Sequence, residues 1–201
     1  MTARTAYDAL LLDYAAGALA PAPALLVETH LRLKPGARAA AGVFDAAGGA
    51  LLEAIAPVAV AAATVPDPGP APEAAEAPDR LVARAIIAAA TEHPDTLRWR
   101  WRAPGLREAR LPLAGASIIR LVGGGALAPH GHTDDEFTLV LRGRFSDSVG
   151  AYAVGDIGFA DEDLDHSPTV PPGEDCICLV ATAGDLKFHS VVARVTARLL
   201  A

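Results

Sequence analysis

The first third of the chain carries apolar residues at helical spacing. This pattern predicts helices over residues 7–18, from Pro21 to the Lys-Pro-Gly sequence at 34–36, and over about 37–55. Proline and glycine end the second helix because both break the helical pattern. The three helices contain few large side chains, so we expect them to need a partner surface or the rest of the chain for stability.

A proline-rich segment follows the predicted helices. Residues 64–78 read TVPDPGPAPEAAEAP, a composition typical of extended backbone without a core. The sequence therefore predicts a small helical domain over 1–63, a linker over 64–78 and a second domain over 79–201. We expect the second domain to begin with a short helix that Asp79 caps and that ends before the His-Pro pair at 93–94.

Beyond residue 94 the apolar pattern changes to a period of two. Leu97, Trp99 and Trp101 alternate with arginines. This pattern predicts a strand whose buried face carries the tryptophans and whose solvent-exposed face carries the arginines. Glycine and proline turns separate five more apolar runs, which predict strands at 106–111, 117–122, 137–141, 156–159 and 176–181. Short strands in regular succession indicate an antiparallel sandwich or barrel, and the fold class is therefore α+β.

Composition and charge narrow the function. The 201 residues carry a formal net charge of -7, so we expect no direct binding to nucleic acid or to an anionic membrane. No segment approaches the ~20 apolar residues that span a membrane, and the start lacks the apolar core of a signal peptide, so we expect a cytoplasmic protein. Cys176 and Cys178 would share one strand face without bridging, and we expect buried free thiols.

The densest chemical signal is the sequence PHGHTDDE. On a strand, His130 and His132 would face the same side and aim both imidazoles into one cavity, and Glu136 adds a carboxylate four residues later. His166 supplies a distant fourth group, after acidic residues that either tune it or merely solvate its loop. These four ligands suit Zn, Fe, Mn, Ni or Cu, and the set alone does not choose among them. The alternative is that these histidines are surface residues beside an acidic turn.

The spacing of these residues resembles the two sequence motifs of the cupins. The first motif, Gly-x5-His-x-His-x3-Glu-x6-Gly, agrees at all five fixed positions: Gly124, His130, His132, Glu136 and Gly143. The second motif, Gly-x5-Pro-x-Gly-x2-His-x3-Asn, is matched by Gly155 and His166, whereas Asp161, Asp163 and Val170 replace its proline, glycine and asparagine. The resemblance implies a C-terminal cupin, an antiparallel jelly-roll barrel that binds one metal through the three histidines and the glutamate.

The N-terminal helices, the proline-rich linker and the C-terminal cupin together resemble the ChrR family of anti-sigma factors. The resemblance covers nearly the full length. It is carried by DALLLDYAAG at 8–17, ETHLRL at 28–33, LRWR at 97–100, DHSP at 165–168 and DCICL at 175–179. The resemblance implies a regulator that holds an extracytoplasmic-function sigma factor inactive.

The N-terminal zinc motif of that family is degenerate here. The family binds zinc through an early histidine and a His-x3-Cys-x2-Cys motif. His30 fills the motif histidine, but Lys34 and Ala37 occupy the cysteine positions, and Thr5 stands about where the early histidine would be. A single imidazole cannot make a tetrahedral site, so we expect no N-terminal zinc and a packed or surface His30. For the cupin we expect zinc, with iron, manganese or nickel as alternatives.

These observations favour a regulator in which the helices contact a sigma factor and the metal-loaded cupin senses an oxidant or small molecule. The alternative is a cupin enzyme, such as a metal-dependent dioxygenase or isomerase, because open coordination positions permit that chemistry. The regulator is preferred because the sequence singles out no separate general base or substrate-binding arginine. A remnant with neither activity and a homodimer through the barrel both stay open.

Overall fold

The computed structural model describes residues 3–58, 77–184 and 186–188. Three helices come first, α1 (Ala3–Ala15), α2 (Pro21–Leu33) and α3 (Pro35–Glu53), and α4 (Pro78–Glu92) follows. The predicted linker at 64–78 lies outside the described residues except for its last two positions. Within the described residues, none of the helices combines the length and the apolar character that crossing a membrane requires.

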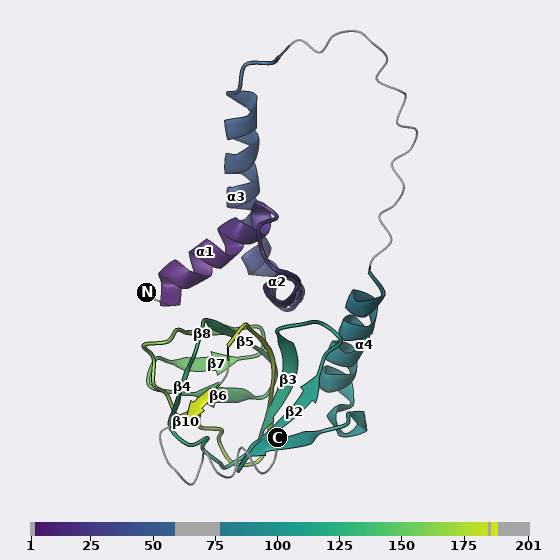
Figure 1. Ribbon diagram of the computed structural model, residues 1–201, viewed down its shortest axis with the longest axis vertical. Coiled ribbons are helices and arrows are strands. Elements are labelled where there is room, and N and C mark those ends of the chain that lie inside the picture. Colours follow the sequence, from purple (N-terminus) through teal and green to yellow (C-terminus); the bar gives the residue numbers. More distant parts are fainter. Residues whose placement is uncertain (1–2, 59–76, 185, 189–201) are drawn as a thin grey trace.

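A short 3-10 turn, η1 (Pro94–Thr96), leads into ten strands in the described part of the chain. They are β1 (Arg100–Ala103), β2 (Leu106–Arg110), β3 (Ala116–Leu121), β4 (His130–His132), β5 (Glu136–Arg142), β6 (Arg144–Ser146), β7 (Ala151–Ala153), β8 (Ile157–Ala160), β9 (Cys176–Thr182) and β10 (Leu186–Phe188). Six form one antiparallel sheet in the order β1-β2-β3-β9-β5-β8, and β10-β4 and β6-β7 form two small sheets. The small sheets face the large one as the second wall of a barrel (Figure 1), in agreement with the predicted α+β class.

Both faces of the large sheet are buried, and its central strand β9 shows this most clearly. Ile177 and Leu179 of β9 belong to the core between the sheet and the helices. Cys176 and Cys178 belong to a second core inside the barrel. A strand that is covered on both sides has no solvent-exposed face, which explains why β9 has no charged residue.

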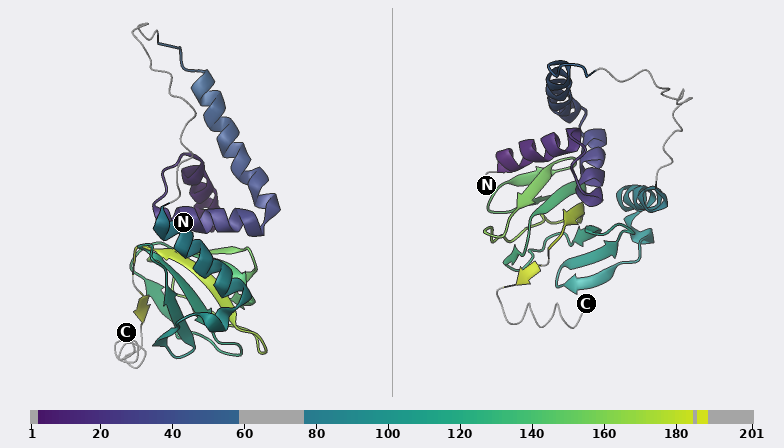
Figure 2. Two further views of the ribbon diagram at one scale, coloured as in Figure 1. Left: turned by 90° about the vertical axis from the view of Figure 1, so that its right-hand side faces the viewer. Right: turned by 45° about the horizontal axis from the view of Figure 1, so that its top comes forward.

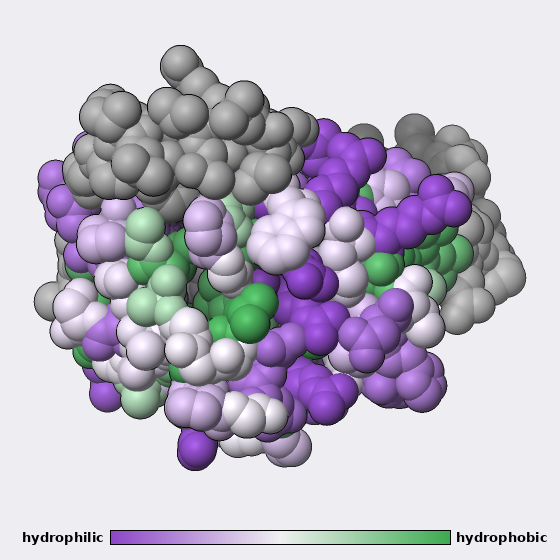
Figure 3. All heavy atoms as spheres, turned by 90° about the horizontal axis from the view of Figure 1, so that it is seen from below, coloured by the Kyte–Doolittle hydropathy of each residue, from purple (hydrophilic) through white to green (hydrophobic). Residues whose placement is uncertain are grey.

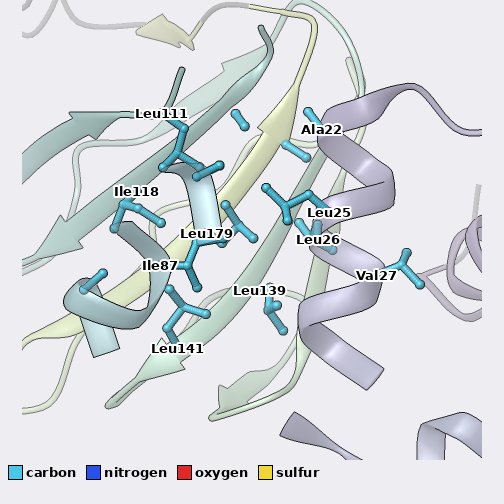
Figure 4. Packing of buried hydrophobic residues seen from close by; sticks show 14 of the residues in the cluster. Ala22, Leu25, Leu26, Val27, Ile87, Leu111, Ile118, Leu139, Leu141 and Leu179 are labelled. Carbon is cyan, nitrogen blue, oxygen red and sulfur yellow. The ribbon is translucent and has the colours of Figure 1, made fainter. Parts of the chain in front are cut away.

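The helices pack on the outer face of the large sheet. Leu25 and Leu26 of α2 lie against Leu139 of β5 and Leu179 of β9, and all four are at most 1% exposed (Figure 4). Ile87 of α4 joins the same core. Fully burying each such side chain contributes about 1.5–3 kcal/mol, so the sheet provides the apolar surface that these short helices lack among themselves. The separate domain boundaries at 63 and 79 stay a prediction, although the helical region and the barrel share this core.

Helix α3 differs from its neighbours because it projects away from the barrel (Figures 1 and 2). Ala41 is the one fully buried residue within α3, all of which the structure describes. Leu51 and Leu52 near its end are each 71% exposed, and Ile55 just beyond it is 66% exposed. These side chains form an apolar surface that nothing in the described part of the chain covers.

Two local predictions are wrong. Asp79 does not cap α4, because Pro78 already occupies its first turn and Ala77 is the capping residue, which makes no side-chain cap. Asp79 instead lies within the first turn, where a negative charge suits the helix dipole.

The predicted alternation in β1 also fails. Trp101 is 47% exposed and lies under the Arg107 guanidinium, 4.5 Å from the centre of its ring. Arg102, expected to be wet, lines the cavity of the barrel. The physical reason is an irregular register between Trp101 and Ala103, since a bulge of this kind changes which side chain faces the interior.

Candidate metal centre

Two backbone segments bring the predicted histidines together. His130 and His132 lie on β4, two positions apart, and therefore face the same side. His166 lies on a loop that runs antiparallel beside β4. The His130 N–H donates to the His166 carbonyl at 3.0 Å, and the His166 N–H donates to the His130 carbonyl at 2.9 Å. This exchange of hydrogen bonds places the third imidazole opposite the other two.

The three imidazoles meet through their Nε2 atoms. The Nε2 of His166 is 3.0 Å from that of His132 and 3.1 Å from that of His130. His130 and His132 are each only 2% exposed. Among the described residues, this cluster is the one group of three or more histidines, cysteines or carboxylates whose ligand atoms all lie within 4.8 Å of one another.

The opposite ring nitrogens decide where the protons reside. His130 Nδ1 donates to the Ala128 carbonyl at 2.9 Å, and His166 Nδ1 donates to Asp147 Oδ2 at 2.9 Å. A proton on Nδ1 leaves the Nε2 of a neutral imidazole as a lone-pair donor. Lone pairs that face one another at about 3 Å repel unless a cation lies between them. These three histidines, two buried and one half-buried, can therefore hold a metal ion.

Glu136, the fourth predicted ligand, lies beside this cluster rather than within it. Its Oε2 is 3.4 Å from His132 Nδ1, and its Oε1 accepts a hydrogen bond from the Thr138 hydroxyl at 3.1 Å. Burial raises the pKa of the Glu136 carboxyl, and the Thr138 hydrogen bond opposes that change. The structure thus brings three of the four predicted ligands together. It places Glu136 next to the Nδ1 of His132 and not among the Nε2 atoms that face one another.

The electrostatics of the cluster favour a neutral His132 imidazole. Burial, followed by the charges of His130 and His166, lowers the pKa of His132 to about 3. At neutral pH its ring is therefore unprotonated, which is the form that binds metal.

Asp147 is a functional residue that the sequence does not single out. Burial acts to raise the pKa of its carboxyl. Hydrogen bonds from His166 and from the backbone N–H groups of Gly150 and Val149 outweigh burial, so the pKa lies below its usual value. Asp147 is therefore ionised and orients His166, as carboxylates next to metal-binding histidines commonly do. In the sequence it resembles any aspartate at a turn.

A cavity of about 150 Å³ extends from the histidines into the barrel. Its polar lining includes Arg102, Glu108, Glu136, Thr138 and Thr182, and most of the other lining residues are apolar, with leucine and phenylalanine side chains among them. Figure 3 shows the face of the molecule seen from below, where apolar side chains lie in a hollow beside a band of hydrophilic ones. The residues that line the cavity therefore include both charged and apolar side chains.

The two cysteines are buried free thiols, as predicted. Cys176 and Cys178 are both fully buried, and their sulfur atoms lie 3.6 Å apart inside the barrel. The hydrogen bond with Cys176, together with burial, holds the pKa of the Cys178 thiol well above its usual value. A thiol in this state is a small apolar core residue.

His30, the remaining histidine of the degenerate zinc motif, is packed between α2 and the barrel. Its Nδ1 donates to the Gly155 carbonyl at 2.7 Å, and its Nε2 accepts from the Tyr7 hydroxyl at 2.8 Å. Lys34, which stands where the zinc motif described above has a cysteine, forms an ion pair with Asp156. Two positions of the zinc motif thus join α2 to the turn between β7 and β8.

An antiparallel barrel with inward histidines from a strand and a facing loop defines a cupin, here with helices packed on its outer sheet. Residues 88–184 match the family model described as ChrR Cupin-like domain. The chain is 41% identical to Anti-sigma-E factor ChrR of Cereibacter sphaeroides over 197 residues, which covers 91% of each chain. The chain belongs to the ChrR family.

A solved structure agrees with this assignment. The chain is similar to the anti-sigma ChrR in its crystal complex with SigE of Rhodobacter sphaeroides, with a TM-score of 0.67 and 41% sequence identity. The match covers 87% of this chain and 96% of the other, so it includes both the helices and the barrel. The predicted family resemblance and the predicted cupin with N-terminal helices are confirmed.

Proposed function

We propose that this chain is an anti-sigma factor that binds an extracytoplasmic-function sigma factor. The observation that carries the proposal is the 41% identity to Anti-sigma-E factor ChrR over 91% of both chains, because helices and barrel are both included. An anti-sigma factor meets its partner where RNA polymerase acts, so the proposal places the chain in the cytoplasm.

The exposed apolar end of α3 is the surface that best suits a protein partner. Leu51, Leu52 and Ile55 are each more than 60% exposed on an element that projects from the body. Large apolar side chains that cluster at a surface commonly mark a protein interface, where a few of them supply most of the binding energy. The sigma factor would cover them.

Co-elution of the full chain with its cognate sigma factor at micromolar concentration tests the proposal. The double variant Leu51→Glu, Leu52→Glu should weaken the complex by ~10-fold or more, since charges would then be buried at the contact. Val149→Glu is the control, because Val149 is also an exposed apolar residue but lies between β6 and β7 of the barrel. Absence of any complex with the unaltered chain would contradict the proposal.

The proposal includes one divalent metal in the barrel, with His130, His132 and His166 as ligands and Glu136 as the fourth. The convergent Nε2 atoms support the three histidines. For Glu136 the support is its cupin-motif position and its place next to His132. Zinc fits such a mixed nitrogen and oxygen set, with iron, manganese or nickel as alternatives. When bound, the metal supplies a Lewis-acidic centre at the wall of the cavity.

Elemental analysis of the purified chain tests the metal and its identity. We expect about one equivalent of zinc per chain, and weaker retention of the metal in Glu136→Gln than in the control Glu174→Gln, whose carboxylate lies at the far surface with Arg142. Equal retention in both variants would show that Glu136 only orients His132. Tightly bound iron together with oxygen consumption would instead favour the alternative, a cupin enzyme.

A further inference from the structure

The barrel cavity holds a second charged group besides the histidines and Glu136. Arg102 enters it from β1 and Glu108 from β2. We propose that this cavity binds a small monocarboxylate with an apolar body, whose carboxylate pairs with Arg102. Neither metal binding nor sigma-factor binding requires such a site, so the inference goes beyond the proposed function.

Arg102 has hydrogen-bonding capacity to spare. Its Nε lies 3.4 Å from Glu108 Oε2, beyond an ordinary hydrogen bond, and its side chain is 31% exposed. Among the described residues, none forms a hydrogen bond with its two terminal nitrogens. These nitrogens are the edge of a guanidinium that pairs with a carboxylate through two parallel hydrogen bonds. The fork of Arg102 is thus available to a ligand.

Local charge favours a singly charged anion. Glu108 Oε2 is shared between Arg102 and Arg110, whose Nε is 3.7 Å away. Two guanidinium groups on one carboxylate leave a net positive charge at this end of the cavity. The guanidinium of Arg102 offers one edge with two parallel donors, which matches the two oxygens of a single carboxylate. A monocarboxylate satisfies both conditions.

The rest of the lining selects an apolar body. Leu106, Leu121, Leu127 and Phe145 line the cavity between the charged groups. The cavity of about 150 Å³ matches in size an apolar cavity that is known to bind benzene. A ligand of this size with one carboxylate is about as large as benzoate, and benzoate is therefore a suitable probe.

Calorimetric titration of the full, metal-loaded chain with benzoate tests the site. We expect saturable binding that is ~10-fold or more weaker in Arg102→Gln, since a hydrogen bond to a charged group is lost. Arg142→Gln is the matched control, because Arg142 is also an arginine paired with a glutamate but does not line the cavity, and the affinity of this variant for benzoate should stay within ~3-fold of the unaltered chain. Unchanged affinity in Arg102→Gln would overturn the proposal.

Two further arms keep the test independent of folding and of the metal. Benzamide has the same shape without the charge, so it should bind ~10-fold or more weakly to the unaltered chain, and equal affinity for the two probes would overturn the proposal. After treatment with a chelator, benzoate should still bind with affinity within ~3-fold. Loss of binding at this step would place the carboxylate on the metal and overturn the role of Arg102. A chain that binds benzoate in this way but no sigma factor would refute only the proposed function.

Discussion

Two buried histidine sites lie on opposite sides of the large sheet, and they are built on different principles. His30, between α2 and the barrel, is 3% exposed, and His130 and His132, inside the barrel, are each 2% exposed. The degree of burial therefore does not distinguish the two sites. The difference lies in what the ring nitrogens meet.

At His30 each ring nitrogen has its own protein partner, a backbone carbonyl for Nδ1 and the Tyr7 hydroxyl for Nε2. Inside the barrel the Nδ1 atoms of His130 and His166 have acceptor oxygens as partners, but the Nε2 atoms face one another. A histidine with both nitrogens satisfied joins parts of the structure, whereas Nε2 atoms that face one another can hold a cation. The direction of the lone pairs, more than burial or residue type, marks a metal site.

The largest expected effect is on metal binding. His132→Ala should remove the bound metal, with a loss of affinity greater than the ~100-fold that changes next to a ligand can cause. His30→Ala should keep the full metal content, because His30 lies on the other side of the sheet with partners of its own. Elemental analysis after dialysis measures both. Metal loss in the His30 variant would break the distinction between the sites.

Asp147→Asn should weaken metal binding by ~10–100-fold, since the carboxylate that orients His166 and stabilises its Nδ1 proton is lost. Competition with a chromogenic chelator measures this affinity. Asp156→Asn is the matched control, because Asp156 is also ionised and paired but lies on the His30 side. If both variants bind metal equally well, Asp147 plays no part in the metal centre.

His30→Ala should lower the free energy of unfolding by ~1–3 kcal/mol, because the Gly155 carbonyl would be left buried without its hydrogen-bond partner. Chemical denaturation of the metal-loaded chain measures the change. His93→Ala, at an exposed histidine, should stay within ~0.5 kcal/mol. A His30 variant as stable as the His93 variant would mean that the contact between α2 and the barrel turn adds no stability.

The pH dependence of stability provides a finer comparison. Burial is the main cause that holds the pKa of His30 below its usual value of 6.5, and Lys34 acts in the same direction. The unfolded chain therefore binds the proton more readily, so the stability that neutral His30 contributes is present above about pH 6.5 and declines as the pH falls below it.

Between pH 7.5 and 5.5 (approximate limits), the melting temperature should fall less in His30→Gln than in the unaltered chain. The titration of Asp156 does not contribute to the change in stability over this pH range. Burial acts to raise the pKa of its carboxyl, but hydrogen bonds from Lys34 and the Ala153 N–H outweigh burial, and its contribution is lost only at more acid pH. Identical pH profiles for the two chains would contradict a neutral His30.

The smallest effect concerns the ion pair beside His30. The side chains of Lys34 and Asp156 are 43% and 32% exposed, so solvent screens their attraction. A double-mutant cycle with Lys34→Met and Asp156→Asn should give a coupling of about 0.5–1 kcal/mol. A coupling of zero would leave the hydrogen bonds of His30 as the polar link between α2 and the barrel turn.

Local spacing predicted much of the fold and part of the site. The strands between β2 and β9 that have continuous apolar runs were predicted within one or two residues. The three-residue strands β6 and β7 were missed, because three positions are too few to show a periodic pattern. His130 and His132 were assigned to one face because the alternation of a strand is a local rule. The solvent exposure of the Trp101 side chain was not predicted, since it depends on the irregular pairing of β1 with β2.

By itself, the sequence determined most of the elements, the family that the chain resembles and the residues that can serve as ligands, since these follow from residue type and short spacings. Only the tertiary structure decided that Asp147 orients His166, that Arg102 enters the cavity and that His30 meets Gly155, 125 positions away. Hydrogen bonds and ion pairs form between neighbours in space, and no periodicity along the chain specifies which distant residues the folded sheet brings together.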